Sequence, residues 1–153
     1  MKKTFFPYLF LATFVLLIFW PATHFEFINF DDNVYVTANP HVLSGLNREN
    51  IQWAFTTNLG GHWHPLTWLS LQLDSTLFGI NPKAFHLENI LIHTLNTLLL
   101  SYLLFRFFKN PLLACLLAAL FAIHPLRIES VVWITERKDV CSLFLGTHDT
   151  LFV

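Results

Sequence analysis

The sequence predicts an all-α membrane protein with about three transmembrane helices and short interfacial helices in a long exoplasmic loop. Hydrophobic residues make up 54% of the chain and charged residues 12%, whereas soluble domains carry about 25% charged residues. The chain also contains 17 phenylalanines, and its mean hydropathy is positive. A soluble core of this size has too little interior for so much aromatic surface, so lipid is the expected solvent.

The overall charge and the cysteines exclude several classes of protein. The net charge is −1, so no basic field indicates a nucleic-acid partner, and no nucleic-acid motif is present. Cys115 and Cys141 stand alone in apolar stretches. Two isolated cysteines make neither a disulfide framework nor a zinc site, and we expect them to pack as small apolar residues.

The first predicted transmembrane helix covers residues 4–22. This stretch carries no charge and follows Lys2 and Lys3, and its length is near the ~20 residues that a spanning helix needs. A cleaved signal peptide is the alternative. The residues from Trp20 to His24 offer no small-x-small cleavage site, so we favour an uncleaved anchor.

The second predicted transmembrane helix covers residues 87–108 and carries a polar stripe. Helical spacing puts four polar residues on one face, while Leu and Ile occupy the others. These four are Glu88, Asn89, His93 and Asn96. A spanning helix turns such a stripe toward protein or water rather than lipid.

The third predicted transmembrane helix covers residues 111–125, after a basic turn around Arg106 and Lys109. The turn is short, so the second and third helices should form an antiparallel hairpin. Residues 126–139 then form an exoplasmic or interfacial segment. Residues 140–153 are apolar but interrupted by polar groups. They fit either an interfacial segment or the truncated start of a fourth helix.

The distribution of basic residues predicts the orientation. Lys2 and Lys3 and the turn with Arg106 and Lys109 are separated by two crossings. They therefore lie on one side, which the positive-inside rule makes cytoplasmic. The loop of residues 23–85 is then exoplasmic. The basic residues of the segment at 124–139 run against the rule, but acidic residues accompany them.

The loop of residues 23–85 is too long for a simple connector. Asn47 is a candidate N-cap for a short helix that runs to Phe55. The turn at residues 60–64 opens a second short helix that ends near Phe78. The tryptophans at positions 53, 63 and 68 are of the type that favours the bilayer interface, so we expect this loop to lie along the membrane surface.

Asp31 and Asp32 are the candidate catalytic residues in this loop. Two adjacent carboxylates repel, so one should hold its proton more tightly, and a carboxylate near the bilayer surface can accept a proton from a hydroxyl nucleophile. The alternative is a turn or a helix cap, which Asp also favours. From this pair alone, the structural role is the more common one.

Two histidines, His62 and His64, flank Trp63. In a strand they would share a face and could bind a metal. No acid or cysteine stands beside them, so no metal site is predicted. Hydrogen bonding to a substrate or to the loop backbone is the favoured role.

The segment at residues 124–139 is the second concentration of polar groups. Pro125 should break the third helix. Arg137 and Lys138 could hold a lipid phosphate, because a guanidinium binds phosphate in a bidentate way. The alternative is a solvated interfacial helix whose ion pairs lie three or four residues apart.

The strings FINFDDNVYVTANPHV, HWHPLTWLSLQLD, LFGINPKAFHLENILIHTLNTLLL and FAIHPLRIESVVWITERKDV carry a family resemblance. The chain resembles the N-terminal part of bacterial proteins that join a transmembrane glycosyltransferase half to tetratricopeptide repeats. These are similar to the animal transmembrane-and-tetratricopeptide O-mannosyltransferases and, more distantly, to the protein O-mannosyltransferases. The resemblance runs from about Phe25 to Leu145.

The resemblance implies a partial GT-C fold with its active site in the first exoplasmic loop. It implies a polyprenyl-phosphate sugar donor, an acceptor hydroxyl that is Ser or Thr of a protein in the animal relatives, and a bacterial inner-membrane location. Asp31 or Asp32 would be the catalytic carboxylate. The substrate-binding residues would be His62, His64, His124, Glu129, Arg137 and Lys138. Arg127 stands where many relatives have His.

We therefore expect the N-terminal part of a membrane glycosyltransferase, with no cofactor other than the lipid-linked sugar and no required metal. The family has more membrane helices and then repeats, so we expect the truncated chain to be inactive alone. The alternative is a non-enzymatic membrane module whose stripe, with Glu88 and His93, serves helix packing or proton movement.

Overall fold

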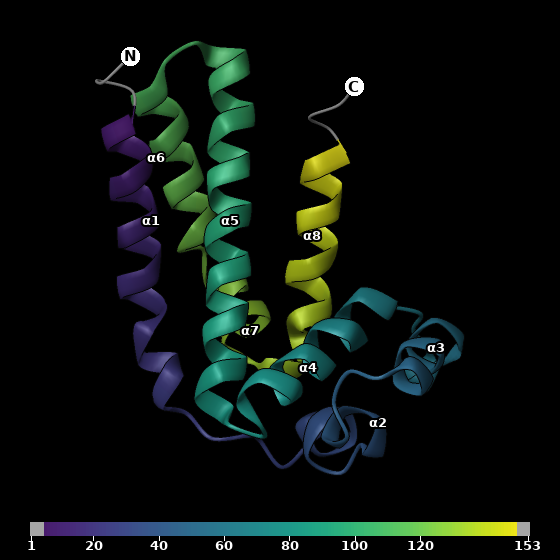
Figure 1. Ribbon diagram of the computed structural model, residues 1–153. Coiled ribbons are helices and arrows are strands. Elements are labelled where there is room, and N and C mark those ends of the chain that lie inside the picture. Colours follow the sequence, from purple (N-terminus) through teal and green to yellow (C-terminus); the bar gives the residue numbers. More distant parts are fainter. Residues whose placement is uncertain (1–4, 150–153) are drawn as a thin grey trace.

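The computed structural model describes residues 5–149, and the described part is built from helices. Helices α1, α5, α6 and α8 run roughly along one direction (Figure 1). Helices α2, α3 and α4 gather at the end of the molecule opposite the start of α1 and the end of α8. The expectations for Lys2, Lys3 and Thr4, and for residues 150–153, lie outside the described residues.

Helix α1 (Phe5–Phe19) is apolar throughout and passes into a 3-10 helix, η1 (Trp20–His24). Pro21 lies in the first turn of η1, where its missing N–H costs no hydrogen bond. The side chains of Phe6 and Leu17 are 72% and 69% exposed, while Val15 is fully buried against the other helices. One face of α1 therefore packs on protein and the other is left for lipid.

Helices α5 (Pro82–Phe108) and α6 (Pro111–Ala122) form the predicted antiparallel hairpin (Figure 1). Lys109 ends α5 in the left-handed conformation, with φ of 55°. The side chain of Asn110 then caps α6 by accepting hydrogen bonds from the N–H groups of Leu112 and Leu113. By length and composition, α1 with η1 and α5 can each cross a membrane, and α6 with α7 is a third span if that bent pair counts as one.

The expected third helix at residues 111–125 is broken. Helix α6 ends at Ala122, and α7 (Pro125–Val132) leaves at an angle of 67°. Pro125 has no N–H to donate to the helical hydrogen-bond pattern, and its ring forces the preceding residue out of the helical region of backbone conformation. His124 accordingly has φ −59° and ψ 134°, and its side chain accepts a hydrogen bond from Leu126 N–H.

The polar stripe of α5 satisfies the backbone that this break leaves open. His93 Nε2 donates to the carbonyl of Ala122 at 3.1 Å, where α6 ends. Asn89 Nδ2 donates to the carbonyls of Val131 and Trp133, at 3.3 and 3.2 Å. Asn96 Nδ2 donates to the carbonyl of Val140 at 2.8 Å. Irregular backbone at membrane depth needs such internal partners, so the stripe faces protein, as expected.

The loop folds into a small unit of its own. It contains a π-helix, η2 (Asn33–Thr37), the helices α2 (Pro40–Leu43) and α3 (Arg48–Thr56), a 3-10 turn, η3 (Leu59–Gly61), and α4 (Pro65–Phe78). The side chain of Asn47 accepts from Asn50 N–H and caps α3, as predicted. Gly45 has φ +70°, and a Cβ there would lie 2.6 Å from Thr76 Oγ1, so α2 and α4 approach closely at this glycine.

Aromatic rings form the core of this unit. Trp68 is fully buried, with its ring centroid 4.8 Å from Tyr35 and 5.0 Å from Trp53. Trp53 in turn stacks on His41 at 4.3 Å. The expectation that Trp68 sits at the bilayer interface was wrong, because the folded loop encloses it. Trp63 is 66% exposed.

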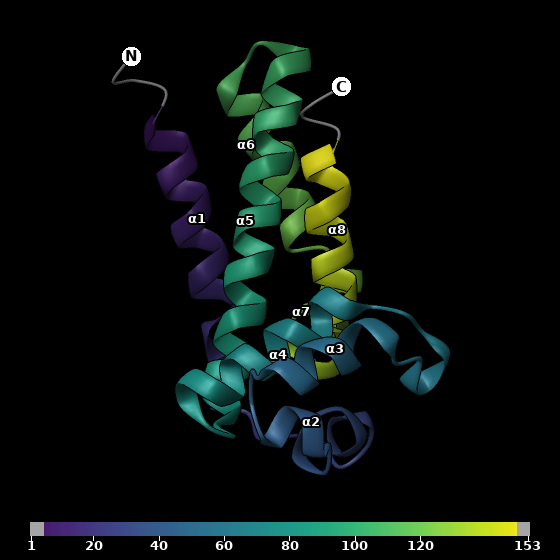
Figure 2. The ribbon, with the colours of Figure 1, turned by 45° about the vertical axis from the view of Figure 1, so that its right-hand side comes forward.

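The last described helix, α8 (Arg137–Asp149), follows a short 3-10 turn, η4 (Ile134–Glu136). It begins three residues before the apolar stretch expected at 140–153. The two views show α8 running beside α5 toward the end of the molecule where α1 begins (Figures 1 and 2). Val140 joins α8 to the core that α1, α5 and α6 share.

Candidate functional site

The two adjacent aspartates at the start of the loop have different environments. The carboxylate of Asp32 is buried, and its two oxygens accept hydrogen bonds from Ile28 N–H at 2.9 Å and Thr135 N–H at 3.3 Å. Asp31 is half-buried, and no hydrogen bond to its side chain is present among the described residues. Asp32 therefore ties the loop to the segment before α8, while the Asp31 carboxylate is not held by a hydrogen bond among the described residues.

The segment from Thr135 to Lys138 alternates between buried and partly exposed side chains. Thr135 and Arg137 are 1% and 0% exposed. Between and after them, Glu136 and Lys138 have side chains that are 16% and 27% exposed and form an ion pair at 2.7 Å. One face of this segment is thus anchored in the protein and the other presents an ion pair.

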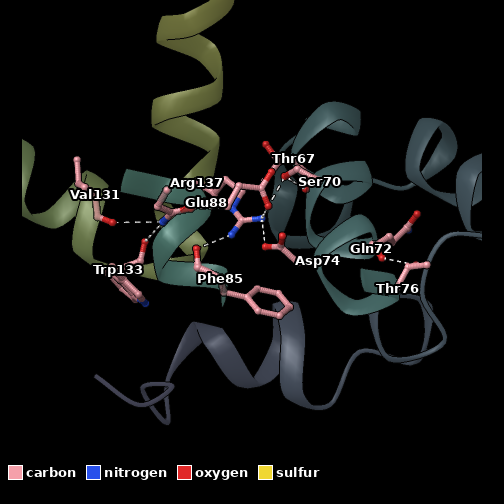
Figure 3. Close-up of polar contacts among 11 residues, drawn as sticks. Thr67, Ser70, Gln72, Asp74, Thr76, Phe85, Glu88, Val131, Trp133 and Arg137 are labelled. Carbon is pink, nitrogen blue, oxygen red and sulfur yellow. Dashed lines mark hydrogen bonds and ion pairs between the residues drawn. The ribbon is translucent and has the colours of Figure 1, made fainter. Parts of the chain in front are cut away.

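Arg137 is the centre of a buried polar cluster that joins three helices (Figure 3). Its Nη1 lies 2.7 Å from Asp74 Oδ2 of α4 and 2.9 Å from Glu88 Oε2 of α5. Its Nε donates to Asn89 Oδ1 at 2.7 Å, and its Nη2 donates to the carbonyl of Phe85 at 2.8 Å. We expected Arg137 near a lipid phosphate, but here the whole guanidinium is enclosed and bonded to protein.

The ion pairs of the segment at 124–139 also differ from the local pattern that we considered. Arg137 pairs with acids that lie 63 and 49 residues earlier in the chain. Lys138 pairs with Glu136, two residues away. Ser130 Oγ donates to Asp139 Oδ2 at 3.2 Å and links α7 to α8. The segment is therefore a tertiary junction rather than an isolated solvated helix.

Tyr35 is the residue that relates five groups at the loop end, because the ring of His64 and the charges of the other three act on it. We call these five residues the loop site: Asp31, Tyr35, His64, Glu136 and Lys138. The rings of Tyr35 and His64 lie 5.8 Å apart. Burial raises the pKa of the Tyr35 phenol, Lys138 opposes this rise, and the charges of Asp31 and Glu136 add to it. Burial disfavours the Lys138 ammonium, but the Glu136 carboxylate outweighs this effect, and the net pKa is raised. Lys138 therefore stays charged beside the acids.

Of the two loop histidines, His64 belongs to the loop site and His62 is exposed. His64 Nδ1 donates to the carbonyl of His62 at 3.0 Å, which leaves Nε2 as the acceptor nitrogen. That Nε2 is buried without a hydrogen-bond partner. Burial lowers the pKa of His64, and Lys138 lowers it further against the bond to His62. Among residues 5–149, no three His, Cys, Asp or Glu side chains are grouped to hold a metal.

His124 and Glu129 lie on the broken part of the third span, away from these contacts. His124 caps α7, and Glu129 is exposed on the same helix. Within the described residues, no hydrogen bond or ion pair joins either side chain to the loop site. Of the predicted site residues, Asp31, His64 and Lys138 are therefore related through Tyr35, whereas His124 and Glu129 are not part of this group.

An apolar groove leads from the membrane helices to the loop site. Its inner part has a volume of about 260 Å³ and lies between α4, α5 and α8. Its outer part has a volume of about 390 Å³ and reaches the loop around Trp63 and His64. The two parts share Leu66 and Cys141. The inner lining is Leu66, Ile92, Leu95, Cys141 and Phe144.

Two residues were not predicted from the sequence: Tyr35 of the loop site and Asp74 of the buried cluster around Arg137. Tyr35 lies in a π-helix, a form that often occurs at functional positions. Asp74 is an acid in the middle of the apolar helix α4, where an unpaired charge would be costly. An acid in such a position indicates that a buried cationic partner is present, but the neighbouring sequence does not show that this partner is Arg137.

Comparison with known proteins identifies the relatives. The chain is 38% identical over 134 residues to protein O-mannosyl-transferase TMTC1 of Homo sapiens, which covers 78% of this chain and 15% of that protein. It is 32% identical over 120 residues to Tmtc1 of Drosophila melanogaster, which covers 74% and 14%. It is 34% identical over 91 residues to TMTC2 of Mus musculus, which covers 58% and 11%.

The chain is homologous to the TMTC protein O-mannosyl-transferases. The expected resemblance to membrane O-mannosyltransferases is thereby confirmed. The chain spans no more than 15% of the length of each of these three TMTC proteins. No protein-family model matches the chain, and no solved structure matches it. The loop site and the groove thus lie in a membrane chain related to a small part of the TMTC proteins.

Proposed function

We propose that this chain supplies part of a membrane glycosyltransferase of GT-C type, which moves a sugar from a polyprenyl-phosphate donor to a protein hydroxyl. The observation that carries the proposal is the half-buried Asp31 carboxylate, whose charge acts on the Tyr35 phenol together with the charges of the Lys138–Glu136 ion pair. Homology to proteins named O-mannosyl-transferases supports the reaction class. The site thus offers a base and a cation at the loop end of the membrane helices.

Asp31 acts as the base in the proposed step. The acceptor hydroxyl gives its proton to the Asp31 carboxylate as its oxygen bonds to the anomeric carbon of the donor sugar. The bond from that carbon to the phosphate oxygen breaks, and its electron pair leaves with the lipid phosphate. Attack from the face opposite the phosphate inverts the anomeric centre. Asp32 is assigned a supporting role, because both of its oxygens already hold backbone N–H groups.

Lys138 stabilises the departing phosphate in this scheme. Its ammonium is partly exposed and stays charged beside Glu136, and a fixed cation near developing negative charge lowers the barrier. Arg137 is not given this role, since its guanidinium has no exposed surface. The exposed His62, His124 and Glu129 are candidates for contacts with the sugar or the acceptor. The step uses no cofactor other than the lipid-linked sugar.

The groove is the proposed place for the lipid chain of the donor. Its inner lining is apolar, and its outer end opens at His64, Thr67 and Ser142. An isoprenoid chain fits the first environment and a phosphate or sugar fits the second. With the loop site placed at the exoplasmic face and the N-terminus in the cytoplasm, the donor enters from the outer leaflet. The location in a bacterial inner membrane stays a prediction, and the relatives named above are animal proteins.

The alternative of a non-enzymatic module for proton movement has little support. His93 and Asn89 donate to backbone carbonyls at the helix break, and Glu88 is paired with Arg137. These contacts favour helix packing as the role of the stripe.

The test uses a full-length TMTC protein whose matching segment is replaced by the sequence of this chain, and changes Asp31 and Asp32 to Asn one at a time. We expect Asp31→Asn to abolish sugar transfer to a peptide acceptor while membrane insertion is unchanged. Asp32→Asn, which keeps an acceptor oxygen, should reduce transfer less. The exposed acid Glu26 offers a matched control, and Glu26→Gln should leave transfer unaltered. Full transfer by the Asp31→Asn variant would contradict the proposed mechanism.

A further inference from the structure

In the four residues from Thr135 to Lys138, buried side chains alternate with partly exposed ones. Thr135 is fixed through its N–H by Asp32, and Arg137 is fixed by α4 and α5. The two neighbours, Glu136 and Lys138, have partly exposed side chains that pair with each other. A helix start that is fixed at two buried points allows little movement of the side chains between and after them.

Resting on the proposed function, we propose that Arg137 is a positioning residue that sets the Lys138 ammonium beside Tyr35. The guanidinium uses all three of its nitrogens, and their partners lie on two different helices. Arg137 is the first residue of α8, so its fixation defines where that helix begins. Lys138 is the next residue, so the position of its backbone is set by the contacts of Arg137.

The geometry requires arginine rather than any cation. The planar guanidinium reaches Asp74, Glu88, Asn89 and the Phe85 carbonyl at 2.7–2.9 Å in four directions. It also stands over the Phe85 ring, 5.5 Å from its centroid. A lysine ammonium has one nitrogen on a flexible stem and cannot reproduce this fork. Arg137→Lys therefore keeps the charge and removes the fixation.

Ionisation of the Tyr35 phenol can report the position of the Lys138 ammonium. The Lys138 charge favours ionisation of the Tyr35 phenol, while Asp31 and Glu136 oppose it, and the ring of His64 lies beside it. Replacing Tyr35 by 3-fluorotyrosine in the 153-residue chain, held in lipid nanodiscs, allows its ionisation to be followed by ¹⁹F NMR. This titration reports the local charge whether or not sugar is transferred.

We expect Lys138→Met to raise the midpoint of this titration, because the neighbouring positive charge is lost. Arg137→Lys should raise it by a similar amount, because Lys138 moves away although both charges remain. Glu88→Gln keeps an acceptor for Arg137 and weakens the ion pair, so a smaller upward shift is expected. Arg106→Lys is the matched control, since Arg106 is exposed, and it should leave the midpoint in place. Helix content by circular dichroism accompanies each variant.

An unchanged midpoint in folded Arg137→Lys, with a raised midpoint in Lys138→Met, would overturn the positioning role. If Arg137→Lys does not fold, the Glu88→Gln variant decides, and an unchanged midpoint there has the same meaning. An unshifted Lys138→Met variant would also overturn it, because Lys138 would then not stand beside Tyr35. The proposed sugar transfer is tested separately, by the transfer assay with Asp31→Asn, so failure of one proposal does not imply failure of the other.

Discussion

The carboxylate of Asp32 accepts the N–H of Thr135 at 3.3 Å, across 103 residues of sequence. The same carboxylate accepts the N–H of Ile28 at 2.9 Å. It thus closes the loop against the start of α8, and it leaves the neighbouring Asp31 as the carboxylate without a hydrogen bond in the described structure. The two adjacent aspartates therefore have different surroundings, and only Asp32 is held by backbone N–H groups in the described residues.

Asp32→Ala should lower stability more than Asp31→Ala. The first variant leaves two N–H groups without their acceptor, and a buried polar group without a partner costs about 1–3 kcal/mol. The second removes a half-buried carboxylate that accepts no hydrogen bond, so we expect less than about 1 kcal/mol. Thermal unfolding in detergent, followed by circular dichroism, measures both. Equal losses in the two variants would contradict the division of roles.

Asn89→Leu should destabilise the junction of α5 with α7 and α8. The change removes the donor to the carbonyls of Val131 and Trp133 and the acceptor of Arg137 Nε. Breaking one partner from a buried charged network costs about 3–5 kcal/mol. Leu95→Ala, on the exposed face of the same helix, is the control and should cost much less. Proteolysis of the folded chain in nanodiscs gives the comparison, and similar cleavage rates in both variants would argue against the junction.

Acidification should weaken the loop through His64. Burial lowers the pKa of this histidine in the folded chain, so the folded state binds its proton less readily than the unfolded state. Its contribution to stability is therefore present above the ordinary pKa of about 6.5 and is lost as the pH falls through the folded-state pKa. His64→Asn, which can still donate to the His62 carbonyl, should flatten the dependence of the melting temperature on pH between 7 and about 5. An unaltered dependence would show that His64 does not contribute to it.

The two thiols should differ in their response to a polyprenyl phosphate. Cys141 lines the groove, whereas Cys115 is buried beside Ser101 in the membrane core. A lipid in the groove should slow alkylation of Cys141 by a maleimide several-fold and leave Cys115 as it was. The Cys115→Ala and Cys141→Ala variants assign the signal in mass spectrometry. Alkylation of Cys141 at the same rate with and without the lipid would show that the lipid does not bind in the groove beside Cys141.

The parts of this fold with a local signal could be predicted from the sequence. The cap at Asn47, the break at Pro125 and the inward face of Asn89 and His93 each follow from spacing or from the chemistry of one residue. The four-residue spacing between Asn89 and His93 was sufficient to place them on one face, but it could not name the carbonyls that they bind.

The parts that depend on distant pairs could not be predicted in this way. Arg137 and Asp74 are 63 residues apart, and no periodicity relates them. Arg137 was therefore expected at a phosphate, since an arginine near a membrane surface commonly binds one. Trp68 was expected at the lipid interface for a similar reason, and only the folding of the loop around it shows that it is a core residue.

The short length of α6 has a consequence for the bilayer around the protein. Its 12 residues rise by about 18 Å, while the 27 residues of α5 rise by about 40 Å and the hydrocarbon layer is about 30 Å thick. Where lipid adjoins α6 and the bend at Pro125, the layer must become thinner to match the shorter apolar surface. Headgroups of the leaflet on the loop side would then sit deeper beside α7 than elsewhere around the molecule, and water would follow them inward.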